Sequence, residues 1–212
     1  MAALFVTGTG TDIGKTFVTA RLIEDAQAQG RAVRAIKPLL SGFDETQLEG
    51  CDAAVLLAAM GLEPSLDNIS AITPWRYELA LAPNMAARAE GRFVDMDAVL
   101  EFCRAEIARA EADGAQLYIE GVGGVMSPVS DQATNLDWIA ALGIPAWLVA
   151  GTYLGAISHT LTAVAAISAA GVPLQGITLS ESEGEQVGLA KTKAELKRFL
   201  AGVSVASVAR AG

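Results

Sequence analysis

Residues 5–16 combine an apolar run, a glycine- and threonine-rich turn, and the triplet Gly14-Lys15-Thr16. This order predicts a strand, a turn and the start of a helix, an arrangement that binds phosphate groups. Backbone N–H groups and the helix N-terminus supply partial positive charge, the lysine contacts the terminal phosphates, and the threonine hydroxyl can hold Mg²⁺. The segment therefore indicates a nucleotide-phosphate site in which Lys15 and Thr16 are the main polar side chains.

The turn differs in one respect from the usual phosphate-binding motif, which has four residues between its glycines. Five residues separate Gly8 from Gly14, and Thr9 stands where the first glycine is expected. The alternative is a glycine-rich turn that contains lysine and threonine by chance. The context argues against it, because a strand precedes the turn and a helix pattern over residues 15–29 follows it.

Two further predicted strands end in ionisable side chains. Residues 117–120 form an apolar run that ends in Glu120, where phosphate-binding enzymes place a second contact to Mg²⁺, directly or through water. Residues 33–37 end in Lys37, which either reaches solvent or points at the phosphates. The acidic remainder of the chain favours the second alternative. Ser41 can add a hydroxyl group from the same loop.

Two other polar residues, Asp52 and His159, allow a structural role. Asp52 begins a predicted helix, so its carboxylate can act as the N-cap or as an acid in the first turn, can hold a metal ion, or can do both. His159, the single histidine of the chain, is predicted to be buried and hydrogen-bonded in a structural role. We find no supported Ser/His/Asp or Cys/His arrangement, so covalent nucleophilic catalysis is not indicated.

Strand and helix patterns alternate along the chain, which is typical of a parallel sheet with helices on both faces. The predicted strands are residues 4–8, 33–37, 117–120, 146–150 and 176–179. The predicted helices are residues 15–29, 52–60, about 85–90, 96–113, 135–142, 156–170 and 189–200. Residues 61–84 are expected to be largely irregular, and residues 203–208 form an apolar tail. We predict one α/β domain over residues 1–212, with a doubly wound, mostly parallel sheet whose strand ends bring the polar loops together.

The charge balance limits the partners of the chain. With 15 Lys and Arg against 24 Asp and Glu, the net charge is −9, so nucleic acid and anionic membranes are poor candidates. Residues 138–180 carry no charged side chain, but Gly and Pro divide them into pieces shorter than the ~20 apolar residues of a membrane span. The early first strand leaves no room for a signal peptide, so we expect a cytoplasmic protein with Cys51 and Cys103 reduced.

The predicted helix over residues 156–170 has small or apolar side chains nearly all round. Such a helix is expected to be buried on more than one side. Because a helix on the surface of a single domain is buried on one side, we infer a subunit interface at this helix.

Together these loops resemble those of the dethiobiotin synthetase family, ATP-dependent cyclo-ligases of biotin synthesis. The resemblance covers residues 1 to about 180 in order, and the longer phosphate loop is that family's own form, with Thr11 in the additional place. The matching segments are residues 8–16, Ile36-Lys37-Pro38, Ser41-Gly42, Asp52-Ala53, Ala82-Pro83-Asn84, residues 120–124 and residues 154–160.

The resemblance implies a homodimer of P-loop NTPase-like subunits that acts on 7,8-diaminopelargonate, CO₂ and MgATP. One amine becomes a carbamate, the carbamate takes the γ-phosphoryl group, and the other amine closes the ureido ring. Lys15 and Lys37 are the implied catalytic residues, the first at the ATP phosphates and the second at the carbamate and γ-phosphate. The implied Mg²⁺ ligands are Thr16, Asp52 and Glu120, and the implied substrate contacts are Thr11, Lys37, Ser41 and Ser158. The implied ATP contacts are Asp12, Ile13, Gly14, Lys15, Thr16, Phe17, Asp52, Glu120, Gly121, Val122 and Gly123.

Two positions depart from the family pattern. The family commonly has Asn-Asp where this chain has Ser180-Glu181, and that Asn reads the adenine edge. The shorter Ser180 predicts a relaxed choice of nucleotide base. Ser158 stands where the family often has an Asn that reaches the substrate carboxylate from the partner subunit.

Other activities remain as alternatives. Amide ligases of the cobyrinate-synthase type share the fold, but they carry a large glutaminase domain for which this chain has no room. Regulatory partitioning ATPases typically have a second lysine early in the phosphate loop, and residues 8–14 contain none. A non-catalytic nucleotide-binding scaffold is the third alternative.

Overall fold

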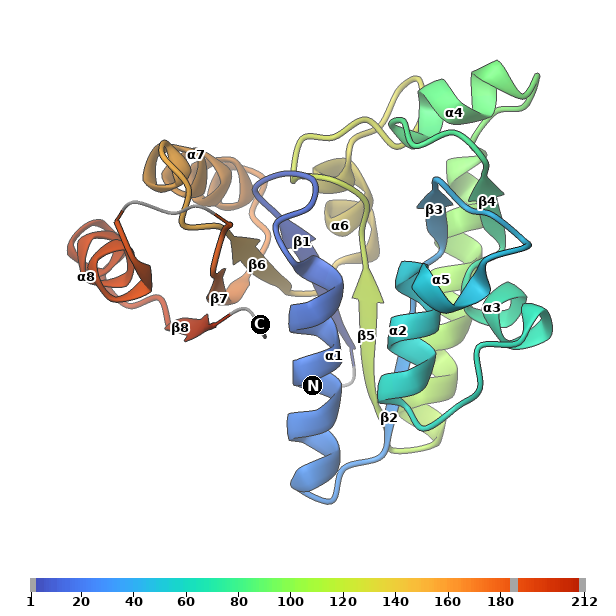
Figure 1. Ribbon diagram of the computed structural model, residues 1–212, viewed down its shortest axis with the longest axis horizontal. Coiled ribbons are helices and arrows are strands. Elements are labelled where there is room, and N and C mark those ends of the chain that lie inside the picture. The colour runs from blue at the N-terminus through green and yellow to red at the C-terminus, as the bar shows by residue number, and fades with distance from the viewer. Residues whose placement is uncertain (1–2, 184–186, 210–212) are drawn as a thin grey trace.

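Six parallel strands form the central sheet of the computed structural model, which describes residues 3–183 and 187–209 (Figure 1). Their order across the sheet is β2-β5-β1-β6-β7-β8. Because neighbouring strands run the same way, their carboxyl ends lie along one edge of the sheet. The strand bounds are β1 Ala3–Gly8, β2 Val33–Ile36, β5 Gln116–Glu120, β6 Ala146–Ala150, β7 Leu174–Ser180 and β8 Val205–Val208.

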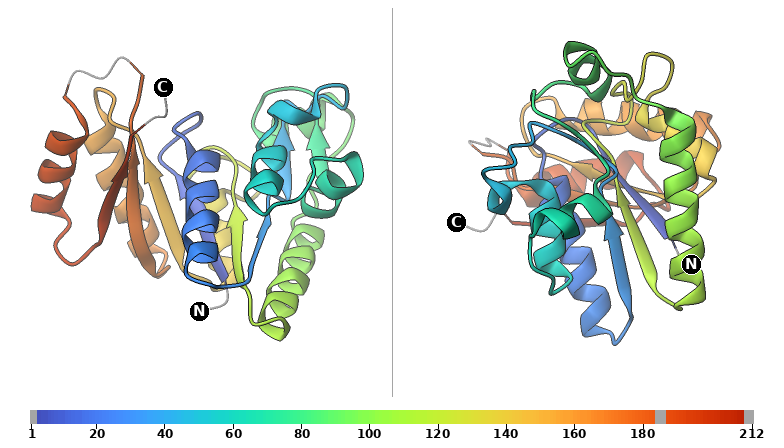
Figure 2. Two further views of the ribbon diagram at one scale, coloured as in Figure 1. Left: turned by 60° about the horizontal axis from the view of Figure 1, so that its bottom comes forward. Right: turned by 90° about the vertical axis from the view of Figure 1, so that its right-hand side faces the viewer.

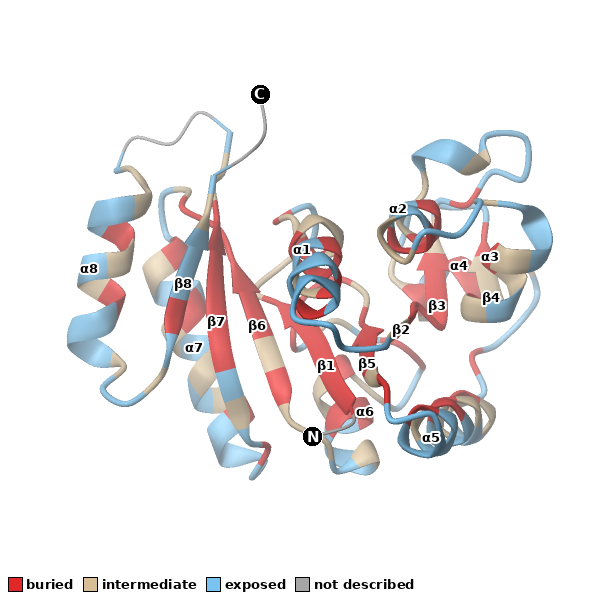
Figure 3. Ribbon diagram, turned by 90° about the horizontal axis from the view of Figure 1, so that it is seen from below, coloured by how far each residue is buried: buried red, intermediate tan, exposed pale blue. Residues whose placement is uncertain are grey.

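Helices cover both faces of this sheet (Figure 3). On one face lie α1 and α2, and on the other lie α5, α6 and α7. Helix α8 packs beside α7 and the outer strands β7 and β8. The helix bounds are α1 Lys15–Ala28, α2 Asp52–Ala59, α5 Met96–Ala112, α6 Asn135–Leu142, α7 Ala156–Ala169 and α8 Leu189–Phe199. The predicted doubly wound, mostly parallel α/β fold is therefore confirmed.

The central strand β1 divides its side chains between two cores, as the alternation of a strand requires. Phe5 packs on one face, where its ring meets Trp138 edge-on at 4.9 Å between centroids. Leu4 and Val6 pack on the other face with Ile23 of α1. Since β1 is held from both sides, the loop that follows it has a rigid base.

The segment predicted to be irregular is more ordered than expected. It contains α3 (Leu66–Ile72) and strand β4 (Trp75–Tyr77), which pairs in parallel with β3 (Leu39–Ser41) to form a separate two-stranded sheet near α2 (Figure 2). A 3₁₀ turn, Leu48–Gly50, precedes α2, and α4 spans Pro83–Ala89. Strands of three residues are too short to show a period of two, so the sequence pattern missed them.

Of the other predicted elements, some have the predicted bounds and others differ at their ends. The helix over residues 135–142 and the strand over residues 146–150 have the predicted bounds. Strand β7 begins two residues earlier than predicted and ends one residue later, and part of the apolar tail forms β8. Within the described residues no helix is long and apolar enough to cross a membrane.

One face of α7 packs inside the chain, through Ala156, Thr160, Ala163 and Ile167. The rest of the helix is half-buried or exposed, so within this chain it is not buried on more than one side. The interface inferred for this helix stays a prediction, whereas the predicted burial of His159 is wrong within this chain. Its ring lies exposed on α7, although it does form a hydrogen bond with the Tyr153 hydroxyl at 2.8 Å.

Candidate active site at the strand ends

The loop between β1 and α1 has the shape of a phosphate cradle. Gly14 has a φ of 86°, in the left-handed region that residues with a side chain rarely adopt. In the described structure no side chain caps α1, and its first turn carries no acidic residue. Its first N–H groups are therefore left for an anionic ligand. Lys15 curls back over the loop and donates from Nζ to the Gly10 carbonyl at 3.0 Å.

The glycine-rich turn after β5 packs directly against this loop. A Cβ atom on Gly124 would lie 3.2 Å from the backbone nitrogen of Gly10, so a side chain here would require the phosphate loop to shift by a few tenths of an ångström. The side-chain amide of Asn135, at the start of α6, donates to the carbonyl oxygens of Val122 and Gly124. The Ser127 hydroxyl accepts from the Gly124 N–H at 2.7 Å. These bonds fix the turn beside the phosphate cradle.

A buried charged cluster lies beneath the two loops. Lys37 is 2% exposed and Glu120 is fully buried. The Lys37 Nζ lies 2.7 Å from Glu120 Oε1 and 2.9 Å from Asp52 Oδ2, and Thr16 donates from Oγ1 to Glu120 Oε1 at 2.7 Å. Cys51 is the N-cap of α2 and makes no side-chain cap, so Asp52 does not cap this helix and lies instead as an acidic residue in its first turn. Its carboxylate pairs with Lys37.

Burial and mutual charge shift the pKa values of this cluster. Burial, together with the nearby Lys37 ammonium, lowers the pKa of Lys15 to about 8. Burial acts in the same direction on Lys37, but the carboxylates of Glu120 and Asp52 outweigh it and raise the Lys37 pKa above its ordinary value. Burial would raise the pKa of Asp52, yet the Lys37 charge holds it below its usual range. Lys37 therefore stays a cation, whereas Lys15, with its pKa of about 8, loses its proton as the pH rises through that value.

These groups open into a cavity of about 800 Å³. Ten of the residues singled out from the sequence line it: Thr11, Asp12, Gly14, Lys15, Thr16, Lys37, Ser41, Asp52, Val122 and Gly123. The Ser41 hydroxyl is buried and has no hydrogen-bond partner within the described residues. A buried hydroxyl without a partner is costly unless a ligand satisfies it.

The other residues predicted for the site do not line the cavity. Glu120 lies behind Lys37, and the Gly121 carbonyl accepts from Lys37 Nζ at 3.4 Å. The side chain of Ile13 packs into the core beneath the loop. Phe17 lies under the guanidinium of Arg21, outside the cavity. Ser158 is exposed on α7 and does not join the site within this chain.

Six lining residues were missed by the site prediction: Leu40, Ala80, Leu81, Ala82, Pro83 and Ser127. Most are apolar and belong to β3 or to the loop before α4, in the region where short strands escaped the sequence pattern. Pro83 occupies the first turn of α4, a helix-start signal. Ser127 gives no signal in the sequence, because its role depends on the fold of the glycine turn.

Ser180 ends β7 directly beside the phosphate cradle. A Cβ atom on Gly14 would lie 2.5 Å from Ser180 Oγ, and the residue is 6% exposed. The relaxed choice of nucleotide base, which was inferred from this serine, stays a prediction.

The donor set of the cavity fits MgATP. Mg²⁺ prefers oxygen ligands and is usually held by one or two carboxylates together with substrate phosphates. Asp52 and Glu120 supply carboxylate oxygens on either side of the Lys37 ammonium, and the Thr16 hydroxyl lies against Glu120 Oε1. No group of three or more His, Cys, Asp or Glu side chains able to hold a metal occurs in the part of the chain described. A metal ion bound here would therefore depend on the nucleotide for further ligands.

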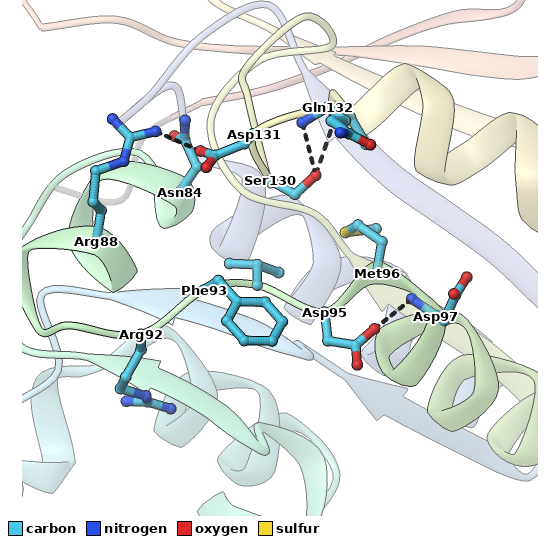
Figure 4. A pocket seen from close by; sticks show the side chains of 12 residues that line it. Asn84, Arg88, Arg92, Phe93, Asp95, Met96, Asp97, Ser130, Asp131 and Gln132 are labelled. Atoms are coloured by element: carbon cyan, nitrogen blue, oxygen red, sulfur yellow. Dashed lines mark hydrogen bonds and ion pairs between the residues drawn. The ribbon is translucent and has the colours of Figure 1, made fainter.

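A second pocket, of about 540 Å³, lies between the α4 region and the start of α5 (Figure 4). Arg88 on its rim pairs with Asp131 at 2.5 Å. Arg92, also in the wall, pairs with Glu90 at 3.1 Å. None of the site residues predicted from the sequence lines this pocket.

Comparisons with known proteins agree with this geometry. Residues 2–209 match a family model described as an AAA domain. The ATP-dependent dethiobiotin synthetase BioD of Methylobacterium nodulans is 45% identical, with 100% of this chain and 95% of that protein covered. The protein of the same name from Caulobacter vibrioides is 44% identical, covering 100% and 94%. A ParA family ATPase from Chlorobium tepidum has a TM-score of 0.52 at 12% identity, covering 99% of this chain and 85% of that one, which shows a shared fold.

Proposed function

Since the chain belongs to the ATP-dependent dethiobiotin synthetase family, we propose that it forms dethiobiotin from 7,8-diaminopelargonate, CO₂ and ATP. The observation that carries the proposal is the buried Lys37, held between Glu120 and Asp52 at the wall of the cavity that the phosphate cradle opens into. The family's reaction needs a fixed cation between a carbamate and a phosphoryl group, and this lysine has the position and the charge for that task.

In the proposed reaction, one amine of the diamine adds to CO₂ and loses a proton to give a carbamate. A carbamate oxygen then attacks the γ-phosphorus, ADP leaves, and a carbamic-phosphoric anhydride forms. The second amine attacks the carbonyl carbon of the anhydride, loses its proton and expels phosphate, which closes the ureido ring. We assign Lys37 to the negative charge on the carbamate and the transferring phosphoryl group, since fixed cations stabilise such charge.

The other residues of the wall bind and orient. Lys15 and the N–H groups at the start of α1 would hold the ATP phosphates. The unpartnered Ser41 hydroxyl and the Thr11 hydroxyl would contact the diamine, which places both amines near the γ-phosphate. Thr16, Asp52 and Glu120 would hold Mg²⁺, which supplies charge neutralisation to the phosphates when bound.

The proposal extends to a homodimer. Leu154, just before α7, is 87% exposed, and Leu161 and Val164 of α7 pack against the core but remain only half-buried. A second copy seated on this helix would cover these apolar side chains. It would also bring Ser158 to the partner's cavity, where the family pattern implies a substrate contact. We also propose a cytoplasmic location.

Phosphate release measured with and without both diaminopelargonate and bicarbonate tests the function. Release that requires both compounds, with dethiobiotin identified by mass spectrometry, is the expected result. ATP turnover indifferent to these additions would instead favour a regulatory ATPase. An absence of turnover with intact ATP binding would favour a scaffold.

A further inference from the structure

Thr19 lies one helical turn after Lys15, on the buried side of α1, and is fully buried. Its Oγ1 lies 2.6 Å from Glu120 Oε2 and 2.9 Å from the Lys15 carbonyl oxygen. Both neighbours are acceptors, and a hydroxyl group has one proton to donate. Bonds from a hydroxyl to a carboxylate are the shorter and stronger kind, about 2.5–2.7 Å. The proton of Thr19 therefore goes to Glu120.

The two oxygens of Glu120 have different surroundings. Oε1 accepts from Thr16 and from Lys37, each at 2.7 Å, and both donors line the cavity. Oε2 accepts from Thr19, its one hydrogen-bond donor among the described residues. Thr19 does not line the cavity. Oε1 is thus bonded to two residues of the cavity wall, while Oε2 is tied to the helix that follows the phosphate cradle.

We propose that Thr19 is a positioning residue that holds Oε2, so that Glu120 presents only Oε1 to the Mg²⁺ of the bound nucleotide. This rests on the proposed function for the identity of the ligand. Without Thr19, Oε2 is a buried acceptor with no donor, a costly state that a carboxylate relieves by rotating about its side-chain bonds. Rotation moves Oε1 away from the metal position. Residues that orient a metal ligand in this way typically contribute about 10–100-fold in metal affinity.

The plainer role for Thr19 is that of a helix threonine bonded to the carbonyl four residues earlier. The chain offers a matched control for it in Thr160 of α7. That residue is also fully buried, and its Oγ1 donates to the Ala156 carbonyl at 2.7 Å. No carboxylate contact is found for it in the part of the chain described. If the hydroxyl serves only the structure of its helix, removing it should have the same effect at Thr19 and at Thr160. An effect on metal binding that acts through Glu120 should occur at Thr19 alone.

The experiment measures Mn²⁺ binding by electron paramagnetic resonance at saturating ADP, for wild type, Thr19→Val, Thr19→Ser and Thr160→Val. We expect about 10–100-fold weaker Mn²⁺ binding for Thr19→Val, a change within about threefold for Thr19→Ser, which keeps the hydroxyl, and wild-type binding for Thr160→Val. In turnover, Thr19→Val should raise the Mg²⁺ concentration for half-maximal rate more than it lowers kcat. If Thr19→Val does not fold, Thr19→Ala provides the same comparison.

Wild-type Mn²⁺ affinity in a folded Thr19 variant without the hydroxyl overturns the inference, as does equal weakening by Thr160→Val. This binding measurement needs no diaminopelargonate, so the outcome is separate from that of the proposed function. Weakened Mn²⁺ binding together with phosphate release indifferent to diamine and bicarbonate would retain the role of Thr19 and remove the synthetase activity.

Discussion

Two ion pairs, one at the cavity at the strand ends and one in the pocket beside α4, differ in how far their side chains are buried. In the cavity at the strand ends, the side chains of Lys37 and Glu120 are 2% and 0% exposed. In the pocket beside α4, those of Arg88 and Asp131 are 66% and 60% exposed. The contact distances are similar, at 2.7 Å and 2.5 Å. Contact geometry alone therefore does not separate a reactive site from a surface ion pair.

Burial makes the difference, because water screens an exposed pair and cannot reach a buried one. Exposed pairs contribute about 0–1 kcal/mol, whereas removing one partner of a buried pair costs about 3–5 kcal/mol. The buried cluster also stands next to unsatisfied polar groups such as the Ser41 hydroxyl. A ligand that enters there replaces missing contacts, while a ligand at Arg88 must displace an existing pair. Burial and unsatisfied polar groups therefore favour the first pocket as the proposed active site.

The largest expected effect comes from Lys37→Gln. We expect loss of diamine-dependent phosphate release by at least about 100-fold, the typical effect of removing a group that stabilises transition-state charge. We also expect a loss of about 3–5 kcal/mol in the free energy of unfolding, because Glu120 is left buried without its cation. Steady-state kinetics and urea unfolding measure the two quantities. Retained turnover would contradict the role of Lys37.

A smaller effect is expected on ADP affinity when the pH is raised, because Lys15 then loses its proton. Its pKa of about 8 lies below the ordinary value near 10.5, so the ligand-free protein loses this proton as pH rises through 8. Phosphate binding requires the ammonium form. ADP affinity should therefore be constant at lower pH and should fall above pH 8, approaching about tenfold per pH unit. Calorimetric titration between pH 7 and 9.5 measures it. Lys15→Met should bind weakly with no such pH dependence, and an equal slope in that variant would refute the assignment.

The smallest effect is expected from Arg88→Gln, the surface counterpart of Lys37→Gln. Both partners of this pair are mostly exposed, so unfolding free energy should change by no more than about 0.5–1 kcal/mol. Turnover by the proposed synthetase assay should stay close to that of wild type. A loss of activity comparable to that of Lys37→Gln would break the comparison and would make the second pocket part of the working site.

Much of the site could be predicted because its residues follow strands whose apolar runs are unmistakable. Lys37 and Glu120 each come at the carboxyl end of a buried strand, and parallel pairing brings such ends to one edge. The phosphate loop has a local signature of its own. The wall near Ala80 and Leu81 could not be predicted in this way, because β3 and β4 are three residues long and their sequence carries no periodic pattern.

For His159, the single histidine of the chain, the sequence pattern made a prediction and the prediction was wrong. Its apolar neighbours predicted burial, but a helix turns its residues through all directions, and His159 lies on the outward face of α7. The composition of a helix gives its average environment. Which face meets the core depends on where the sheet lies.

The sequence by itself determined the alternating α/β order, the phosphate loop, and the identity of the ionisable groups at the strand ends. These are local properties, set by hydrophobic spacing and by the conformational needs of glycine. The tertiary structure decided that Asp52 turns to Lys37, that Thr19 meets Glu120, and that Lys15 titrates near pH 8. Such facts depend on contacts between residues far apart in the chain and on how far burial excludes water, and neither is encoded in any one segment.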